Sequence, residues 1–236
     1  MYMEALITAS GEGRRLRPLT NTIPKALVKV CGRPAIDYVF DYFNEAGIGD
    51  EKITVTVGYK REKMFDYLSG RHIKYIVSYK PESMAHIITV ASHLMTEPFV
   101  VVGADALQPA AVITDSYKLF NDLKLSALFH CLPKNNKFSD KIITFEEYLY
   151  EHDRLEKETK GEEYIKYTAV IYDPKALQEI EEHVPLRDEK FKHTKLAELI
   201  HRNGGQVRCL FTNHWYIYID TPEQLADAEK TLGLYI

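Results

Sequence analysis

The sequence has 236 residues, of which 45% are hydrophobic and 27% are charged, a composition typical of a folded globular protein. Its formal net charge of −4 argues against binding along a nucleic-acid backbone, because such binding relies on many Lys and Arg side chains. The apolar run around Phe99–Val102 is far shorter than the roughly 20 residues of a membrane-spanning helix. We therefore expect an enzyme-sized globular protein with neither a nucleic-acid partner nor a membrane partner.

The cysteines and the N-terminus bear on the cellular compartment. Cys31, Cys131 and Cys209 are widely spaced and odd in number, which fits unpaired thiols in a reducing compartment. The start Met1–Glu4 has no basic segment of the kind that opens a secretory signal. We expect a cytoplasmic protein, and because no linker or repeat divides residues 1–236, we expect a single domain. The oligomeric state cannot be deduced from these features.

Strand-like runs alternate with segments of helical periodicity, which predicts an α/β fold with a mostly parallel central sheet sandwiched by helices. The polar segment Pro133–Asp140 is expected to be a loop. The expected strands are Glu4–Thr8, Ile53–Val57, Ile73–Val77, Phe99–Val102, Ser126–Leu132, Tyr164–Tyr172, Val207–Phe211 and Tyr216–Ile219. The expected helices are Pro34–Ala46, Glu62–Leu68, Met84–Met95, Val112–Leu123, Pro174–Glu182, Lys192–Asn203 and a last helix that begins at Pro222.

A loop rich in glycine and arginine follows the first expected strand. The glycines of Gly11-Glu12-Gly13 allow backbone N–H groups to turn inward as a nest for anionic oxygens. Arg14, Arg15, Arg17 and Lys25 concentrate positive charge nearby in a protein that is acidic as a whole. The loop leaves the carboxyl end of a strand, where open α/β sheets bind ligands. The sequence thus predicts a phosphate site, with a solvated surface turn as the alternative.

Two familiar phosphate-binding loops do not fit these residues. A dinucleotide-binding loop needs a third glycine at the position of Leu16 and an immediate helix, whereas Pro18 follows here. A P-loop needs Gly-Lys followed by Ser or Thr, and the sequence contains no such triplet. The sequence also has neither a His-Glu-x-x-His pair nor a Cys/His cluster with zinc spacing.

The segment Leu6–Lys25 carries the pattern Gly-x-Gly-x-Arg-Leu-x-Pro-Leu-Thr and a later Pro24-Lys25 pair, and it resembles the signature of sugar-phosphate nucleotidyltransferases. The similarity continues through Val28–Ile48. The resemblance implies a nucleotide-diphospho-sugar transferase-like α/β fold in which the loop wraps the triphosphate of a nucleotide. It implies that Lys25 neutralises charge at the α-phosphate or the departing pyrophosphate. The nucleotide-binding residues that it implies in this loop are Ala9, Ser10, Gly11, Glu12, Gly13, Arg14, Arg15 and Lys25.

Two carboxylates are candidate ligands of the Mg²⁺ that the resemblance implies as a cofactor. Asp105 follows a buried strand within Gly103-Ala104-Asp105, a spacing similar to that of phosphocholine cytidylyltransferases. Together with Arg15 and Lys25, Asp105 is expected to be catalytic. The second expected ligand is Asp220, although many relatives place this acid two residues earlier, where Tyr218 stands. Asp220 could instead belong to the cap of the last helix, and both interpretations stay open.

The segments expected to contact the base and the acceptor depart from the family pattern. Ser83 and Met84 are candidates for base contact in place of the family's Gly-Thr-Ala segment, with helix capping as the alternative for Ser83. The nucleobase is therefore open, with CTP favoured over UTP, GTP and dTTP. Lys157 is the candidate for binding the acceptor phosphate, with a solvated charged segment as the alternative.

Together these features imply an enzyme. It would transfer a nucleotidyl group from a nucleoside triphosphate to a phosphorylated small molecule, such as a sugar 1-phosphate or phosphocholine, and release pyrophosphate. The alternative is a catalytically weak regulatory subunit of the same fold that binds nucleotide.

Overall fold

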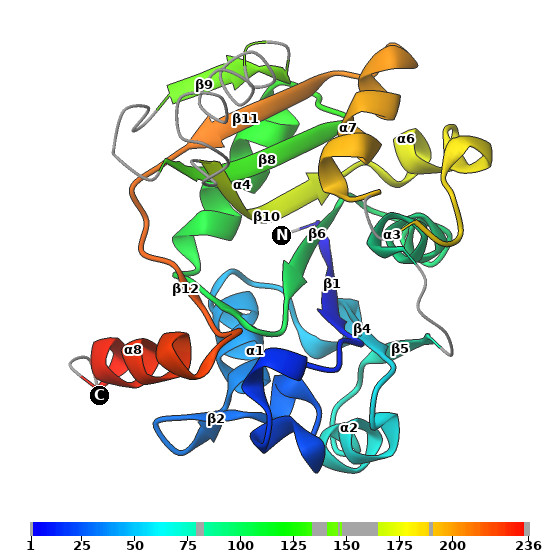
Figure 1. Ribbon diagram of the computed structural model, residues 1–236. Coiled ribbons are helices and arrows are strands. Elements are labelled where there is room, and N and C mark those ends of the chain that lie inside the picture. Colours follow the sequence, from blue (N-terminus) through cyan, green and yellow to red (C-terminus); the bar gives the residue numbers. More distant parts are fainter. Residues whose placement is uncertain are drawn as a thin grey trace.

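The computed structural model describes residues 2–78, 83–133, 141–145, 147, 165–188 and 191–233. Eight strands form the central sheet in the order β5-β4-β1-β6-β10-β8-β11-β9 (Figure 1). Their bounds are Glu4–Ala9 (β1), Ile53–Val57 (β4), Lys74–Val77 (β5), Phe99–Gly103 (β6), Ala127–Pro133 (β8), Lys141–Thr144 (β9), Ile165–Tyr172 (β10) and Val207–Phe211 (β11).

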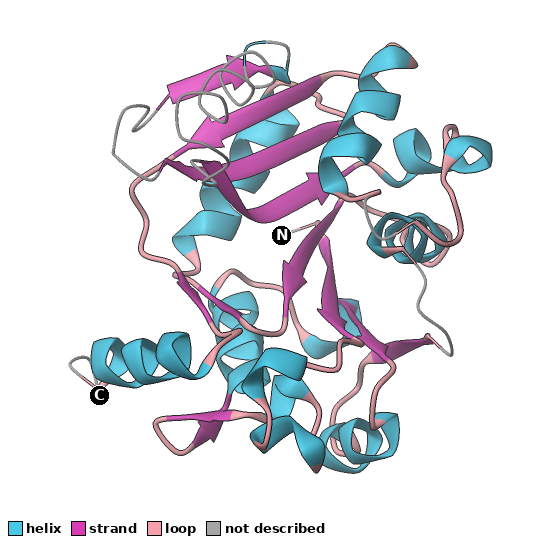
Figure 2. Cartoon of the chain, in the orientation of Figure 1, coloured by secondary structure: helices cyan, strands magenta, loops and turns pink. Residues whose placement is uncertain are grey.

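Helices cover both faces of this sheet (Figure 2). The α-helices are Ala35–Glu45 (α1), Arg61–Leu68 (α2), Met84–Ser92 (α3), Ala111–Asp122 (α4), Pro174–Gln178 (α6), His193–Arg202 (α7) and Pro222–Leu232 (α8). Short 3-10 turns are Arg14–Leu16 (η1), Leu19–Asn21 (η2), Lys25–Leu27 (η3), Asp50–Lys52 (η4) and Glu181–His183 (η5). Two small two-stranded sheets pair Lys29–Val30 (β2) with Arg33–Pro34 (β3), and Ala106–Leu107 (β7) with Ile217–Tyr218 (β12).

The sheet contains two parallel sections joined by an antiparallel strand. β5, β4, β1 and β6 run parallel to their neighbours, and β8 runs parallel to β11. β10 lies between the two sections and is antiparallel to both β6 and β8, while β9 is antiparallel to β11. The predicted α/β fold class, with a mostly parallel sheet sandwiched by helices, is confirmed.

Two apolar cores lie on opposite faces of the sheet. Successive side chains of a strand point to opposite faces, so Ala5 and Ile7 of β1 belong to one core and Leu6 to the other. The first core packs against α1, α2, α4 and α8, and the second against α3, α6 and α7. Phe99–Val102 of β6 is buried throughout because helices cover this central strand on both sides, which explains its unbroken apolar run.

The predicted elements agree with the structure in their order, while several ends differ. β4 and β11 have the predicted bounds, whereas β9, β7 and the β2–β3 pair were not predicted. The helix predicted from Pro174 to Glu182 ends at Gln178, and η5 follows after Ile180 turns its buried side chain into the second core. The predicted loop Pro133–Asp140 lies, apart from Pro133, outside the described residues. Within the described part of the chain, no helix has the length and apolar character needed to span a membrane.

Glu4 is a buried carboxylate at the start of β1, with 6% of its surface exposed. Its Oε2 accepts hydrogen bonds from the backbone N–H of Thr96 at 2.7 Å and of Glu97 at 3.1 Å. Lys74 Nζ of the edge strand β5 lies 3.5 Å from its Oε1. Glu4 therefore holds the start of β1 to the turn that precedes β6 and to β5.

We expect Glu4→Ala to lower the free energy of unfolding by about 1–3 kcal/mol, because two backbone N–H groups lose their charged acceptor. Urea unfolding followed by circular dichroism measures this change. The matched control Glu45→Ala, at an exposed site on α1, should stay within about 0.5 kcal/mol of the wild type. Equal stabilities of the two variants would contradict the structural role of Glu4.

Candidate active site

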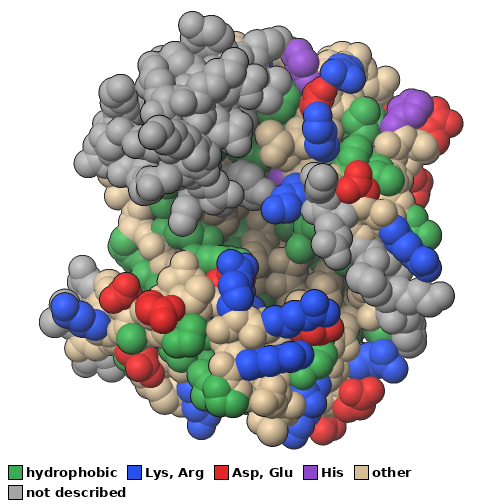
Figure 3. All heavy atoms as spheres, viewed as in Figure 1, with side chains coloured by type: hydrophobic (Ala, Val, Ile, Leu, Met, Phe, Trp, Pro, Cys, Tyr) green, Lys and Arg blue, Asp and Glu red, His purple; other side chains and the backbone are tan. Residues whose placement is uncertain are grey.

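A cleft of about 1280 Å³ opens at the carboxyl ends of the parallel strands β1, β4 and β6. One wall is the loop that follows β1, from Ala9 to Arg15. The opposite wall consists of Thr168–Val170 of β10 together with Lys192 and His193 at the start of α7, and we call these residues the far wall. Figure 3 shows the hollow, with Lys and Arg side chains gathered along one rim.

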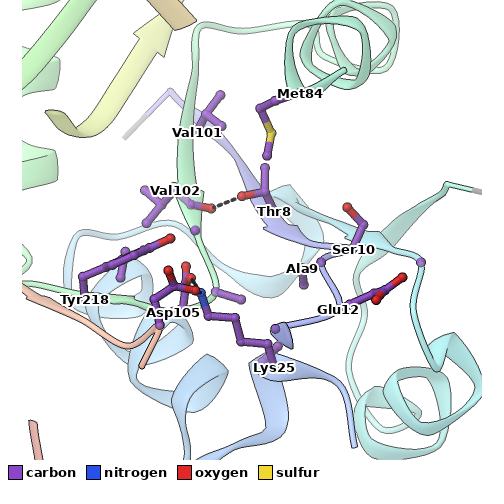
Figure 4. A pocket seen from close by; sticks show the side chains of 18 of the residues that line it. Thr8, Ala9, Ser10, Glu12, Lys25, Met84, Val101, Val102, Asp105 and Tyr218 are labelled. Atoms are coloured by element: carbon purple, nitrogen blue, oxygen red, sulfur yellow. Dashed lines mark hydrogen bonds and ion pairs between the residues drawn. The ribbon is translucent and has the colours of Figure 1, made fainter. Parts of the chain in front are cut away.

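Lys25 lies between two carboxylates on the floor of this cleft. Its Nζ contacts Asp105 Oδ2 and lies 2.7 Å from Asp220 Oδ1. The three side chains are only 13%, 15% and 8% exposed, respectively. Arg15 contacts the other oxygen of Asp220 from the exposed side of the loop. The fold thus brings four of the predicted site residues into one charged cluster, and Figure 4 shows Lys25 reaching Asp105 beside Tyr218.

The charges around Lys25 set its protonation state. Burial alone lowers the pKa of an ammonium, but Asp105, with contributions from Tyr218 and Asp220, more than offsets this and raises the pKa of Lys25. The Nζ of Lys25 also lies 4.7 Å from the centroid of the Tyr218 ring. Burial, with Asp105 as the next cause, raises the pKa of Tyr218 to about 12. At neutral pH, Lys25 is therefore a cation and Tyr218 a neutral phenol.

The end of β6 sets the position of Asp105. A Cβ atom on Gly103 would collide with Oδ1 of Asp105, so glycine at this position leaves room for the carboxylate. The carbonyl of Asp105 accepts a hydrogen bond from the backbone N–H of Ile219 at 3.0 Å. The adjacent pairing of β7 with β12 places Ala106 opposite Tyr218. This small sheet, which sequence analysis did not predict, fixes the start of the last helix beside Asp105.

Asp220 takes part in the cap of the last helix, and its carboxylate also belongs to the charged cluster at Lys25. Thr221 is the N-cap of α8, and its Oγ1 accepts a hydrogen bond from the N–H of Gln224 at 3.3 Å. Gln224 Oε1 accepts in return from the N–H groups of Asp220 and Thr221 at 2.9 Å and 3.1 Å. The backbone of Asp220 thus joins a capping box while its carboxylate contacts Lys25. The same capping box therefore holds the start of α8 and fixes the backbone from which the Asp220 carboxylate extends.

The loop after β1 is held in a tight turn. Gly13 has a left-handed backbone with φ 62°, and its carbonyl accepts a hydrogen bond from Thr20 Oγ1 at 2.8 Å. On the rim, Arg14 Nε lies 2.6 Å from Glu12 Oε2, and this hydrogen bond lowers the pKa of Glu12. The predicted nucleotide-binding residues Ala9, Ser10, Gly11, Glu12, Gly13, Arg14, Arg15 and Lys25 all line the cleft.

Ser83, a predicted base contact, is 2% exposed and does not line the cleft. Its hydroxyl caps α3 by accepting from the N–H of His86 at 3.1 Å and donates to the carbonyl of Pro185 at 2.8 Å, which fits the capping alternative. The adjacent Met84 lines the cleft instead (Figure 4). Lys157 lies outside the described residues.

The residues of the far wall were not predicted from the sequence. Thr168, Lys192 and His193 come from β10 and α7, and no short motif marks them. Tyr216 also lines the cleft and stacks on Tyr218, with ring centroids 6.4 Å apart and planes within 9°. The spacing of two residues between these tyrosines is the signal that would have indicated a common strand face.

The family described as nucleotidyl transferase matches residues 4–221 of this chain, which include both walls of the cleft and the charged cluster. The chain belongs to this family. It is therefore a nucleotidyltransferase, and the predicted family and enzyme class are confirmed.

Individual relatives extend this comparison. The chain is 25% identical over 238 residues to a UTP–glucose-1-phosphate uridylyltransferase of Haloferax volcanii, covering 98% of this chain and 96% of that protein. It is 47% identical over 70 residues to a choline-phosphate cytidylyltransferase of Streptococcus pneumoniae, covering 30% of this chain and 29% of that protein. Three bifunctional proteins of Methanococcus, named GlmU, match over a quarter of their own length.

Solved structures share the fold. A UDP-glucose pyrophosphorylase in complex with UDP-glucose superposes with a TM-score of 0.76 at 17% identity, and the match covers 100% of both chains. At this level of identity the likeness concerns the fold alone.

Gly13→Ala should destabilise the protein by about 1–2 kcal/mol, because a side chain is unfavourable in the left-handed region. The new Cβ would also lie 2.9 Å from Lys25 Cβ and 3.1 Å from Thr20 Cγ2. The matched control is Gly11→Ala, since a Cβ at Gly11 meets no atom within 4 Å. Urea unfolding should show a lower midpoint for Gly13→Ala and an unchanged midpoint for Gly11→Ala. Equal midpoints would contradict the strained turn.

Proposed function

We propose that this nucleotidyltransferase moves a nucleotidyl group from a nucleoside triphosphate, with CTP favoured, to the phosphate of a small phosphorylated acceptor. The observation that carries the proposal is the buried cluster of Lys25, Asp105 and Asp220 beside the turn at Gly13. A nest of N–H groups with nearby cations suits a triphosphate, and the two acids suit a divalent cation.

The donor set of Asp105 and Asp220 fits Mg²⁺. Both carboxylates contact one point, the Nζ of Lys25, so their oxygens converge closely enough to share a cation. Within the described residues, no group of three or more His, Cys, Asp and Glu side chains forms a metal site. Mg²⁺ commonly takes one or two carboxylates and completes its shell with water and phosphate oxygens. When held by Asp105 and Asp220, Mg²⁺ would supply positive charge that offsets the negative charge of the phosphate groups.

In the proposed reaction, an oxygen of the acceptor phosphate forms a bond to the α-phosphorus of the triphosphate. The bond from the α-phosphorus to the bridging oxygen of the β-phosphate breaks, and pyrophosphate leaves with that electron pair. The attacking oxygen is already ionised at neutral pH, so no proton transfer is needed. Lys25 and Arg15 stabilise the negative charge on the phosphoryl oxygens, and the low exposure of Lys25 strengthens its share of this interaction.

The acceptor is proposed to be phosphocholine, with sugar 1-phosphates as the second candidate. The stacked rings of Tyr216 and Tyr218 line the cleft beside the two acids, a surface that suits a quaternary ammonium group. The local identity of 47% to a choline-phosphate cytidylyltransferase supports this candidate and CTP as the donor. The full-length similarity to a glucose-1-phosphate uridylyltransferase supports the second. Lys157 remains the proposed contact of the acceptor phosphate.

Two further proposals concern the chain as a whole. We propose that residues 1–236 act as one domain, which the match of the family across residues 4–221 supports. We also propose a cytoplasmic location, which the free thiols of Cys31, Cys131 and Cys209 support.

Release of pyrophosphate with each of the four nucleoside triphosphates, in pairwise combination with phosphocholine and glucose 1-phosphate, tests the reaction. Lys25→Ala and Asp105→Asn should lose at least about a hundredfold in kcat, because the first removes a cation that stabilises the reacting phosphates and the second removes a proposed ligand of Mg²⁺. Asp227→Asn, at an exposed site of α8, is the matched control and should keep full activity. Full activity of either site variant would contradict the proposed mechanism.

Nucleotide binding without turnover would support the alternative of a catalytically weak regulatory subunit. Isothermal titration of the wild type with CTP and Mg²⁺ measures binding independently of the pyrophosphate assay. We expect both binding and turnover, because the charged cluster is assembled and buried.

Replacement of Tyr216 distinguishes the two acceptors. We expect Tyr216→Leu to raise the KM for phosphocholine about tenfold, because one face of the aromatic surface is lost, and to leave the KM for CTP unchanged. Tyr216→Phe keeps the ring and is the matched control. Sugar 1-phosphates would become the favoured acceptor if Tyr216→Leu left the KM for phosphocholine unchanged. The same conclusion would follow if the wild type turned over glucose 1-phosphate alone.

A further inference from the structure

Thr168 occupies a special backbone position on the far wall. In the pairing of β10 with β8, Tyr167 lies opposite Cys131, and Ala169 lies opposite the adjacent residue His130. Thr168 is therefore the extra residue of a β-bulge, a feature that redirects a side chain and is frequent beside active sites. The residue is only 5% exposed, and it lines the cleft.

The hydroxyl of Thr168 is held by a buried histidine. His130 Nδ1 lies 2.8 Å from Thr168 Oγ1, and His130 Nε2 lies 2.8 Å from Thr212 Oγ1. His130 is fully buried, and this burial, with a smaller effect of His214, lowers its pKa to about 3. The imidazole is therefore neutral at physiological pH, with one nitrogen that donates a hydrogen bond and one that accepts.

The surroundings of Thr212 indicate which nitrogen carries the proton. Thr212 Oγ1 accepts a hydrogen bond from the N–H of His214 at 3.5 Å. When the Thr212 hydroxyl donates to Nε2 of His130, both its proton and its oxygen have partners, and the Nδ1–H donates to Thr168. In the opposite tautomer, the proton of Thr212 has no partner among the described residues, and Thr212 does not line the cleft, so the full cost of a buried unpaired hydroxyl remains. In the first tautomer the unpaired proton is that of Thr168, which lines the cleft, where water or a bound molecule can accept it. The first tautomer is therefore favoured.

In that tautomer, Thr168 Oγ1 accepts from His130, and its own proton is available to a molecule in the cleft. We infer that Thr168 is a specificity-determining residue that donates a hydrogen bond to an oxygen of the phosphorylated acceptor, with His130 as its positioning residue. The inference rests on the proposed function, because the loop opposite takes the triphosphate and leaves the far wall to the acceptor.

The test is the KM of Thr168→Val for each substrate, measured by pyrophosphate release. The donor is CTP, and the acceptor is whichever of phosphocholine and glucose 1-phosphate the wild type turns over. Valine keeps the shape of threonine and removes the hydroxyl. We expect the KM for the acceptor to rise about tenfold and the KM for the triphosphate to stay unchanged, since one hydrogen bond to the acceptor is lost. Thr168→Ser keeps the hydroxyl and should restore most of the affinity.

The matched control is Thr54→Val on β4. Thr54 is also a buried strand threonine, with 1% exposure, and it does not line the cleft. Its replacement should change neither KM. The inference is overturned if Thr168→Val leaves the acceptor KM unchanged, or if it raises the KM for the triphosphate instead. In either case, turnover by the wild type still upholds the proposed function. Absence of pyrophosphate release by the wild type with every pair overturns the proposed function and the inference with it.

His130 is tested through its dependence on Thr168. Asparagine can present an amide N–H near the position of Nδ1, whereas leucine cannot. We expect His130→Leu to raise the acceptor KM, and His130→Asn to raise it less. In a Thr168→Val background, His130→Leu should add no further change to the acceptor KM. Additive effects would overturn the role of His130 as the positioning residue, and thermal unfolding of each variant separates loss of folding from loss of affinity.

Discussion

The fold of this protein depends on one arrangement of charges, in which Lys25 lies between Asp105 and Asp220 and Arg15 supplies a second cation at Asp220. Two carboxylates that share a nearly buried site repel one another, and an unpaired charge in that position costs several kcal/mol. Lys25 and Asp220 are 195 positions apart in the sequence. Their contact therefore requires the N-terminal loop, the end of β6 and the start of α8 to meet at one point.

Local features around this cluster follow from that requirement. Gly13 turns the loop so that it closes over Lys25, and Gly103 leaves the space that the carboxylate of Asp105 occupies. The capping box at Thr221 fixes the backbone of Asp220, and the pairing of β7 with β12 fixes the strand before it. Each of these features is small, yet together they hold the side chains of Lys25, Asp105 and Asp220 in one geometry. Such preorganisation is the main resource of a catalyst that stabilises charge on phosphates.

The cleft wall formed by the loop after β1 could be predicted from the sequence, because the physical requirements there are local. A tight turn needs glycine, a phosphate site needs N–H groups and cations, and a buried central strand needs an apolar run such as Phe99–Val102. The second expected metal ligand was harder to choose between Asp220 and Tyr218, since that choice depends on the register of a two-residue strand. β9 and β7 were missed for the same reason, because such short strands exist through their partners rather than through their own sequence.

The far wall could not be predicted, and the reason bears on specificity. Thr168 reaches the cleft through a bulge in the pairing of β10 with β8, and its hydroxyl contacts His130 of β8, which in turn contacts Thr212 directly after β11. No spacing within the sequence indicates that these three residues lie together. Residues of this kind can change without disturbing Lys25 and its carboxylates. A family can therefore keep one way of handling a triphosphate while its members differ in the molecule that meets the nucleotide across the cleft.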